Sequence, residues 1–466
     1  MIYPKQKFQS LAMLILLLLS TGFLFPSCKK DSNVTSTYVA QNEVRDSAYL
    51  ITKDIYLWSE LLPSITDFQP RNLKDIYAVM NKVRSYQPLD RFSFVETKAE
   101  TEQSQQGLDS DFGFLVKFYT SQTDLRVNYV YATSPAGVRG VQRGWKVLSI
   151  NGRTMSGSQS DIDFLNNLFF GNATSADFNF QLPDGSTQTI TIPKGIYALN
   201  TVLYKNIYTN GPQKVGYFVF NQFSGPSSVN ELITTINYFQ SNGINDLIVD
   251  LRYNRGGYVT TQDPLANMLA PQSVGFGQKT MYTYVFNQKY SKWNETTKFY
   301  KTGSLNLNRI VFIVTPSTAS ASELLINNLR PVMQVKLVGE KNTYGKPVGF
   351  FPIPVFNYNI YPVSFKTVNS VGSADYYQGF PVDKNASDDL SRNFGDESEA
   401  SLKEALNYLY TGNFTATAQK RIMAVGSIPE YQLDNVNKAI NEQVPKVQIE
   451  NRYRKMPQFI RERQKR

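Results

Sequence analysis

The sequence predicts an α+β chain of several units: a small helical unit at the N-terminus, a small and mostly β domain, and a larger α/β core with strand-helix-strand units. Three observations support this prediction. Apolar residues recur at three- and four-residue steps over 41–100, alternate in short runs over 106–198, and mark strands and helices in turn over 200–415. A chain of 466 residues, of which 41% are hydrophobic, is long enough for two or three cores.

The composition removes several kinds of chemistry. The chain has no histidine, which excludes the Ser-His-Asp triad, the Cys-His pair and histidine-ligated zinc, and its single cysteine excludes an intramolecular disulfide. The net charge of +10 lies at the two ends of the chain, since residues 31–443 sum to zero. A neutral body lacks the basic stripe that a phosphate backbone requires, so we expect no nucleic-acid partner.

Residues 1–27 have the pattern of an export signal. Two lysines precede an apolar run over 11–25, and Ser27 stands directly before Cys28. A membrane-spanning anchor is the alternative, but the run is shorter than the roughly 20 residues that a bilayer needs. The segment resembles the lipobox of bacterial lipoproteins. The resemblance implies lipidation at Cys28, a polar tether over 28–40, and a place in the bacterial cell envelope, on its periplasmic or its outer face.

The helical unit is predicted over 41–100. A first amphipathic helix ends before Pro63, because the residue before a proline disfavours helical geometry. A second helix repeats the pattern, and neither helix carries residues that indicate catalysis. The apolar positions are Val44, Ala48, Ile51, Ile55, Trp58 and Leu62 in the first helix, and Leu73, Ile76, Met80 and Val83 in the second.

The β domain is predicted over 106–198. Its short alternating runs are separated by turns, of which the dipeptides Asn151-Gly152 and Asp184-Gly185 are the strongest signals. The expected strands are 112–118, 125–132, 145–150, 178–182 and 187–192.

The order of these segments resembles a PDZ domain. Phe112-Gly113-Phe114-Leu115 stands where that family has its carboxylate-binding loop, and residues 134–137 and then 144–152 match a later segment of the family. The resemblance implies that backbone N–H groups of the loop bind the terminal carboxylate of a peptide, while the peptide adds a strand to the sheet edge. The alternative for residues 112–115 is that they are only the start of a β-strand.

From residue 200 to about 415, strand and helix patterns alternate, which predicts an α/β core with at least partly parallel strands. A basic tail follows over 416–466. The expected strands of the core are 215–220, 246–251, 310–314 and 335–338, and its expected helices lie around 232–239, 321–329 and 402–409.

Without histidine, a nucleophilic serine needs another base, and lysine is the main alternative. The spacing S-x-x-K occurs only at Ser27, and G-x-S-x-G does not occur, which counts against β-lactamase-type and nucleophile-elbow sites. The run 315–323 stands between a predicted strand and a predicted helix. Within it, Ser320 and Glu323 have the spacing of a capping box, and a serine at a helix N-terminus also lies where the dipole favours a developing oxyanion.

Two more segments could contribute to a site, although each has a simpler interpretation. Residues 250–257 leave a buried strand and end in Gly256-Gly257, which would let backbone N–H groups approach a carbonyl or would only form a turn. Residues 339–346 form a polar loop that ends in Gly345-Lys346, which is usually a surface turn.

Taken together, these segments resemble the C-terminal processing, or tail-specific, serine peptidases. That family has a helical part, a PDZ domain and a core with D-L-R-x-N-x-G-G, S-A-S-E and G-E-x-T-x-G-K, and this chain has them in that order over roughly residues 40–410. The resemblance implies Ser320 as the nucleophile, Lys346 as the general base, and the backbone N–H groups of Ala321, Gly256 and Gly257 as oxyanion donors. It implies a peptide or protein substrate and no metal or cofactor.

The chain departs from the family pattern at two places. One extra residue lies between Glu340 and Thr343, and Phe350 stands where the family often has a glutamine. For Lys346 to act as a base, its pKa must fall from the ordinary value near 10.4, and a fall of about three units corresponds to roughly 4 kcal/mol. We therefore expect Lys346 in an apolar cleft near Tyr344 and Phe350.

Two other classes of protein remain as alternatives. The first is a lipid-anchored peptide-binding protein whose peptidase core is inactive, which Phe350 favours and the presence of both Ser320 and Lys346 disfavours. The second is an envelope glycan-binding protein, suggested by 29 Tyr and 30 Phe. Aromatic residues in such numbers mostly pack in cores and sheets, so this alternative has little support.

Overall fold

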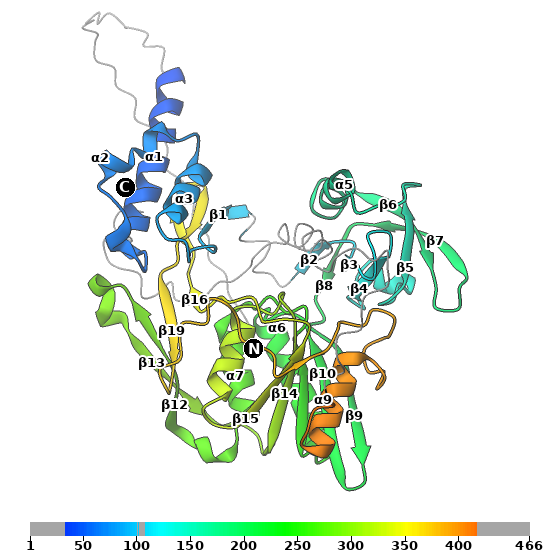
Figure 1. The fold of residues 1–466 in the computed structure, drawn as a ribbon. Helices are drawn as coiled ribbons and strands as arrows, with labels where there is room; N and C mark the ends of the chain where they lie inside the picture. Colours follow the sequence, from blue (N-terminus) through cyan, green and yellow to red (C-terminus); the bar gives the residue numbers. More distant parts are fainter. Residues whose placement is uncertain (1–32, 100, 102–107, 417–466) are drawn as a thin grey trace, which may run out of the picture.

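The computed structural model describes residues 33–99, 101 and 108–416, and its elements fall into three regions (Figure 1). The predicted signal, Cys28 and nearly all of the predicted tail lie outside the described residues. Within the described ranges, no helix combines the length and the apolar character needed to cross a membrane.

The N-terminal region contains α1 (Asn33–Ile55), the short helices η1 (Ser59–Leu61), α2 (Ile65–Phe68) and η2 (Pro70–Asn72), then α3 (Ile76–Ser85) and β1 (Phe94–Thr97). Helix α1 begins inside the predicted tether, because once a helix is nucleated each further polar residue extends it at little free-energy cost. It ends at Ile55, before Pro63, because the N–H of Leu57 donates to the Val363 carbonyl at 2.8 Å instead of to its own helix.

The helices of this region do not form a core of their own. The buried side chains of α1 and α3, such as Tyr49 and Met80, belong to the same continuous cluster as Phe218 and Leu324 of the α/β region. The expectation of a separate helical domain over 41–100 therefore differs from the packing in the structure. Sequence periodicity identifies an apolar helix face, but it does not identify the surface that covers the face.

The β region has one antiparallel sheet with its own apolar cluster and the strand order β3-β4-β5-β6-β7. The strands are β3 (Phe114–Phe118), β4 (Leu125–Val130), β5 (Lys146–Ile150), β6 (Ser175–Gln181) and β7 (Thr187–Pro193). Beside this sheet, β2 (Leu108–Asp111) pairs with β8 (Gly195–Ala198). A helix that we did not expect, α5 (Gln159–Phe170), begins after the cap Ser158 and buries Ile162, Leu165 and Phe169.

The α/β region is built on a six-stranded sheet with the order β20-β15-β14-β11-β10-β9. All neighbours are parallel except β9 and β10, which pair as an antiparallel hairpin. The strands are β9 (Val202–Asn210), β10 (Gln213–Phe220), β11 (Asp246–Asp250), β14 (Arg309–Val314), β15 (Gln334–Gly339) and β20 (Lys384–Asn385). This is the partly parallel sheet that strand-helix alternation predicts.

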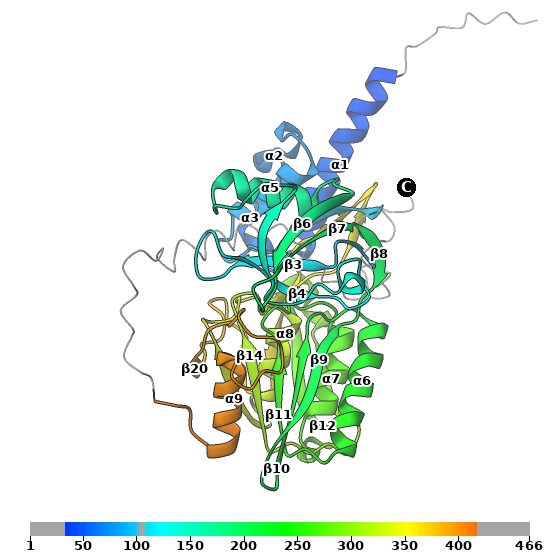
Figure 2. The same ribbon diagram turned by 90° about the vertical axis from the view of Figure 1, so that its right-hand side faces the viewer.

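Helices cover both faces of this sheet (Figure 2). On one side lie α6 (Pro226–Ser241), α7 (Val259–Leu269) and α8 (Ala321–Leu329), and on the other lies α9 (Ala400–Thr411). All nine residues of α8 are buried, polar ones included. Buried polar side chains need hydrogen-bond partners, and partners of the polar side chains of α8 lie in the site described below.

Two small sheets extend the region toward the N-terminal helices. The first has the order β13-β12-β19-β16 and the second β1-β18-β17. In β12 the alternation of Tyr282, Tyr284 and Phe286, all buried, is a strand signal that we did not use. The strands of these two sheets are β12 (Phe276–Phe286), β13 (Glu295–Tyr300), β16 (Val348–Gly349), β17 (Ile353–Val355), β18 (Tyr358–Tyr361) and β19 (Phe365–Asn369), together with β1. Three further short helices lie in the connections: η3 (Gly137–Arg139), η4 (Gln272–Val274) and η5 (Gln288–Trp293).

Candidate active site

Ser320 stands at the junction of β14 and α8 in a strained backbone conformation. Its φ is 57° and its ψ is −110°, a region that costs a non-glycine residue about 1–3 kcal/mol and persists only where the surroundings impose it. Here the turn before Ser320 is fixed: Thr318 Oγ1 donates to the Leu251 carbonyl at 2.8 Å, and Ala319 N–H donates to the Asn254 carbonyl at 3.1 Å. Two loops that are far apart in sequence therefore hold Ser320 at the start of α8.

Glu323, the third residue of α8, connects Ser320 to the loop of residues 339–346, which we call the lysine loop. Its buried carboxylate accepts the Ser320 N–H at 2.9 Å, which is the glutamate arm of the predicted capping box. The same carboxylate accepts the Thr343 hydroxyl at 2.5 Å and the N–H groups of Gly345 and Lys346 at 2.7 and 2.8 Å. Burial raises the pKa of Glu323, and these hydrogen bonds oppose that rise.

Lys346 lies beside Phe350, as expected, and its second aromatic neighbour is Phe92. Lys346 is 6% exposed, and its Nζ lies 4.0 Å from the centroid of the Phe350 ring and 5.5 Å from that of Phe92. Gly345 has a φ of +89°, and a Cβ on it would lie 2.2 Å from the Tyr377 carbonyl oxygen, so only glycine fits before the lysine. The Gly-Lys pair is thus part of a packed loop, and the surface-turn alternative does not hold.

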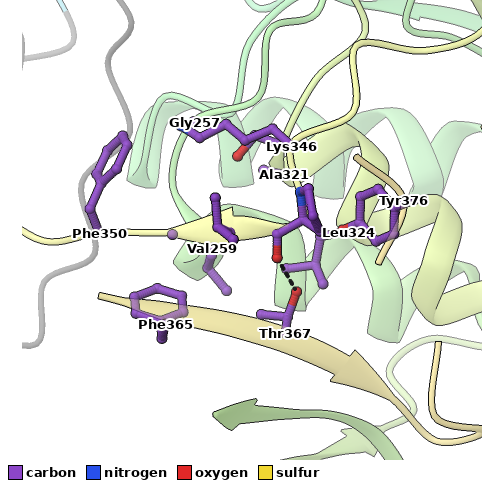
Figure 3. Close-up of a pocket in the computed structure, with 13 residues that line it drawn as sticks. Gly257, Val259, Ala321, Leu324, Lys346, Phe350, Phe365, Thr367 and Tyr376 are labelled. Atoms are coloured by element: carbon purple, nitrogen blue, oxygen red, sulfur yellow. Dashed lines mark hydrogen bonds between the residues drawn. The ribbon is translucent and has the colours of Figure 1, made fainter. Parts of the chain in front are cut away.

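Ser320 and Lys346 line the same pocket, and Figure 3 shows Lys346 among its lining residues. Side chains from α7, α8, β16 and β19 form its walls, and most of them are apolar. The lining residues are Gly257, Val259, Ser320, Ala321, Leu324, Lys346, Pro347, Val348, Gly349, Phe350, Phe365, Thr367 and Tyr376. An apolar pocket beside a hydroxyl and an amine suits an apolar side chain of a bound peptide.

The glycine pair after β11 reaches the same pocket through Gly257. Gly257 has a φ of +138°, and a Cβ on it would lie 2.2 Å from the Phe223 carbonyl oxygen. The N–H of Gly256, by contrast, donates to Asn254 Oδ1 at 2.9 Å. Of the predicted oxyanion donors, Gly257 and Ala321 therefore remain, since Ala321 is the first residue of α8 and its N–H has no partner within the helix.

A buried ionic network lies behind this glycine turn and joins the α/β region to the β region. The Arg252 guanidinium contacts Asp250, Asp388 and Glu399 at 2.8–2.9 Å, and Asp388 also contacts Arg143 at 2.7 Å. Burial alone would raise the pKa of Asp388, but the cations beside it hold the pKa well below its ordinary value. The D-L-R motif is visible in the sequence, but nothing near it indicates Arg143, Asp388 and Glu399, which lie more than a hundred residues away.

The predicted carboxylate-binding loop of the β region is partly occupied by the chain itself. The rings of Phe112 and Phe114 are buried in the core of the sheet. The N–H of Gly113 donates to Asp111 Oδ1 at 2.5 Å, and the Tyr197 hydroxyl donates to the same oxygen at 2.8 Å. Burial raises the pKa of Asp111, against the effect of these hydrogen bonds.

Sequence reasoning missed three residues that support this pocket without lining it. Glu323 was interpreted only as a helix cap, although a glutamate in an otherwise apolar helix face signals a buried partner. Arg91 and Phe92 precede β1 and reach the lysine loop from the N-terminal region, and no local pattern marks them. Arg91 and Phe92 contact residues that come more than 250 positions later in the chain.

Comparisons with known proteins point to one peptidase family. Residues 214–367 match the model described as Peptidase family S41. A carboxyl-terminal-processing protease of Picosynechococcus sp. is 31% identical over 161 residues, which are 34% of this chain and 36% of that protein. Another, from Synechocystis sp., is 24% identical over 285 residues, 59% of this chain and 62% of that protein. The chain thus spans about a third to three fifths of these curated relatives.

Among solved structures, one described as a candidate S41 protease from Bacteroides fragilis has a TM-score of 0.63 and 22% identity. The match covers 79% of this chain and 97% of that one, and it shows that the mixed α/β fold with several sheets is shared. The family model and the curated relatives together support peptidase family S41, the family of C-terminal processing proteases, for this chain.

Proposed function

We propose that this protein is a serine-type peptidase in which Ser320 is the nucleophile and Lys346 the general base. The observation that carries the proposal is that both residues line one pocket while a single carboxylate, Glu323, accepts hydrogen bonds from both backbones. A strained serine at a helix N-terminus and a buried lysine are the two parts that such a dyad needs.

In the proposed mechanism, the neutral amine of Lys346 takes the proton of the Ser320 hydroxyl as the oxygen attacks the scissile carbonyl. The negative charge that develops on the carbonyl oxygen accepts hydrogen bonds from the N–H groups of Ala321 and Gly257. The lysine ammonium then protonates the departing amine. Water, deprotonated by the same lysine, hydrolyses the acyl-enzyme. No metal or cofactor takes part.

Among the effects on the Lys346 amine, desolvation favours the neutral form and the contact with the Phe350 ring opposes it. Removal of an ammonium group from water can disfavour the charged form by about 3–5 pH units, or roughly 4–7 kcal/mol. The Phe350 ring, 4.0 Å from Nζ, stabilises the cation, but a desolvated cation–π contact is worth only about 2 kcal/mol. With Lys346 6% exposed, the larger effect is desolvation, so Phe350 is compatible with a catalytic role for the lysine.

Covalent trapping tests the proposal against an inactive, peptide-binding relative. We expect a fluorophosphonate to add one phosphonyl group to the wild-type chain and none to Ser320→Ala, as measured by intact mass, with peptide hydrolysis lost in parallel. Ser322→Ala is the control, because its hydroxyl donates to the Asn254 carbonyl at 3.0 Å and does not line the pocket. A wild-type protein that neither reacts nor hydrolyses peptides would favour the inactive alternative.

We also propose that the β region is PDZ-like and binds substrates through their C-termini, as strands added to β3. The support is that β3 is an edge strand of its sheet and begins at Phe114, within the segment 112–115. Because Asp111 engages the Gly113 N–H, an incoming carboxylate would depend on the remaining N–H groups of this loop.

A pair of peptides that differ only at the C-terminus tests this recognition. We expect a peptide with a free, apolar C-terminus to be cleaved about tenfold faster than its amidated twin at low concentration, because charge-assisted hydrogen bonds contribute roughly 1.5–3 kcal/mol. Hydrolysis of the two peptides is followed side by side by chromatography. Equal rates would mean that Asp111 keeps carboxylates out and that the β region accepts internal segments.

For the N-terminus we propose lipidation at Cys28 and an anchor in the bacterial cell envelope, where the substrates would be envelope proteins or peptides. The support is the lipobox-like sequence alone. We expect radiolabelled palmitate to enter the wild-type protein in cells and not Cys28→Ala, and the labelled protein to sediment with membranes. Equal labelling of both proteins would contradict the anchor.

A further inference from the structure

A segment from outside the residues that match the family model packs against Lys346 and its loop, behind the lining of the pocket. Residues 90–94 connect α3 to β1, and Phe92 places its ring 5.5 Å from Lys346 Nζ. The next residue back, Arg91, donates to the carbonyls of Gly345 at 3.4 Å and Tyr377 at 3.2 Å. One of these carbonyls directly precedes Lys346 in the chain, and the other belongs to the loop against which Gly345 packs.

The segment is rigidly held by its own polar contacts. Asp90 is 4% exposed, and its carboxylate accepts the N–H groups of Phe92 and Ser93 at 3.0 and 2.9 Å. It also accepts the Ser93 hydroxyl at 2.6 Å and the Tyr56 hydroxyl at 2.7 Å. Burial, and then the nearby Asp90, raise the pKa of Tyr56, so this hydroxyl stays a donor. The turn that presents Arg91 and Phe92 is therefore built in, and it does not depend on the rest of the pocket for its shape.

We propose that Arg91 and Phe92 are positioning residues for Lys346, so that the N-terminal region forms part of the catalytic centre. Arg91 fixes the backbone of the lysine loop from outside, and Phe92 keeps water away from the amine. The inference rests on the proposed role of Lys346 as the general base. Neither side chain lines the pocket itself, so neither is expected to touch substrate.

The two aromatic rings near Lys346 have different effects on its protonation. The Phe350 ring lies at 4.0 Å, within close cation–π range, and stabilises the ammonium form. The Phe92 ring lies at 5.5 Å, where that attraction is weaker and exclusion of water is its main effect. Removal of Phe92 should admit water and favour the ammonium form, whereas removal of the Phe350 ring should favour the neutral amine. The two substitutions should therefore shift the pH dependence of the rate in opposite directions.

The other titratable groups around the lysine loop come from four elements. Substitutions at the two phenylalanines leave all of these groups in the chain, so each variant differs from wild type in one ring alone. These groups are Asp90 and Arg91 before β1, Glu323 on α8, Glu340, Lys341 and Tyr344 on the lysine loop, and Tyr376 and Tyr377 on the loop after β19.

The chain offers a matched control in the same region. Phe68 is as buried as Phe92, belongs to the same apolar cluster, and has a lysine over its ring, with Lys82 Nζ at 4.6 Å from the centroid. Phe68→Leu therefore removes a comparable ring and a comparable lysine contact, but far from the pocket. For Arg91, the control is Arg71→Ala, because Arg71 is an exposed arginine of the same region that pairs with Asp46 at 2.6 Å.

The experiment is the kcat and KM of peptide hydrolysis by the full chain between pH 5.5 and 9.5. For Phe92→Leu and Phe92→Ala, we expect the acid limb of the kcat profile to move to higher pH by about 0.5–1 unit, with KM within twofold of wild type. For Phe350→Leu, we expect the acid limb to move to lower pH by a similar amount. For Arg91→Ala, we expect kcat to fall about tenfold and KM to stay nearly constant, because a misplaced base slows the chemical step alone. Phe68→Leu and Arg71→Ala should leave the profile in place even where stability falls.

The outcomes separate this inference from the proposal on which it rests. If wild type is not trapped by the fluorophosphonate and hydrolyses nothing, the peptidase assignment is wrong. If wild type is active, and Phe92→Leu and Arg91→Ala keep the wild-type profile and kcat, the assignment stands and the positioning role is wrong. A Phe92→Ala chain that does not fold leaves Phe92→Leu and the exposed Arg91 to decide.

Discussion

Lys346→Ala lowers kcat/KM for peptide hydrolysis by about 10³- to 10⁶-fold, the range found when a base or nucleophile is removed from a catalytic unit. The reason is that the sequence contains no histidine, so no imidazole can replace the lysine amine as the base for Ser320. Ser320→Ala should lose a similar factor, and the double variant should be little worse than either, because the two groups act in one step. Steady-state hydrolysis of a fluorogenic peptide measures all three variants.

The matched control for this prediction is Lys336→Ala. Lys336 lies on β15 and pairs with Asp383 at 2.8 Å, far from the pocket lining, so its loss should leave kcat/KM unchanged. Circular dichroism should show that both lysine variants keep the wild-type fold. Near-normal turnover by a folded Lys346→Ala chain would refute the dyad and would assign the base to another group.

Glu323→Gln is expected to have the largest effect on stability. The two carboxylate oxygens of Glu323 accept four hydrogen bonds, two of them on each oxygen. An amide keeps one acceptor oxygen and turns an NH₂ group toward two donors, which leaves buried N–H or O–H groups without partners at about 1–3 kcal/mol each. We therefore expect the free energy of unfolding to fall by roughly 2–6 kcal/mol, with kcat reduced because Ser320 and Lys346 lose their common partner.

Urea unfolding at pH 7 measures the change, with two controls. Thr343→Val keeps the volume, removes one of the four donors and leaves the Phe380 N–H without the hydroxyl oxygen that accepts it at 2.7 Å, so it should lose less stability than Glu323→Gln but more than a surface substitution. Glu60→Gln, at an exposed position, should lose almost none. A Glu323→Gln chain as stable and as active as wild type would show that the four hydrogen bonds do not hold the site together.

The same carboxylate gives the stability a pH dependence of known sign. Because burial raises the pKa of Glu323, the folded chain binds this proton more tightly than the unfolded chain does. The contribution of the protonated group to stability is therefore complete below its ordinary value of 4.5 and is lost as the pH rises through the higher value of the folded state. As the pH rises through this range, wild type should lose stability and Glu323→Gln should not. The difference between their free energies of unfolding should therefore become smaller.

Local patterns predicted much of the secondary structure of this chain. Strand-helix alternation predicted β10, β11, β14 and β15, because buried parallel strands are short apolar runs that do not depend on distant residues for recognition. The helix α5 was within reach too, since Ser158 caps it and Ile162, Leu165 and Phe169 have helical spacing. The prediction failed there because the surrounding strands set an expectation that overrode the local signal.

The candidate site was predictable in part. Three short motifs indicated Ser320, Lys346 and the glycine turn, and the structure places Ser320, Lys346 and Gly257 at one pocket, while their chemical roles remain predictions. What the motifs could not provide is the set of contacts across the fold, such as Glu323 to Lys346 or Arg91 to Gly345. Such contacts depend on how the loops meet in space, and a periodic pattern contains no information about that meeting.

The packing of the N-terminal helices has a consequence for biosynthesis. Leu57 pairs with Val363, the Tyr56 carbonyl accepts from the Asn287 amide, and β1 pairs with β18, so the first region of the chain is completed by residues made much later. At ordinary rates of translation, about 15–60 s separate the emergence of these partners. During that interval the apolar faces of α1 and α3 lack the residues that cover them in the folded chain, and exposed apolar surface of this kind favours aggregation of an incomplete chain.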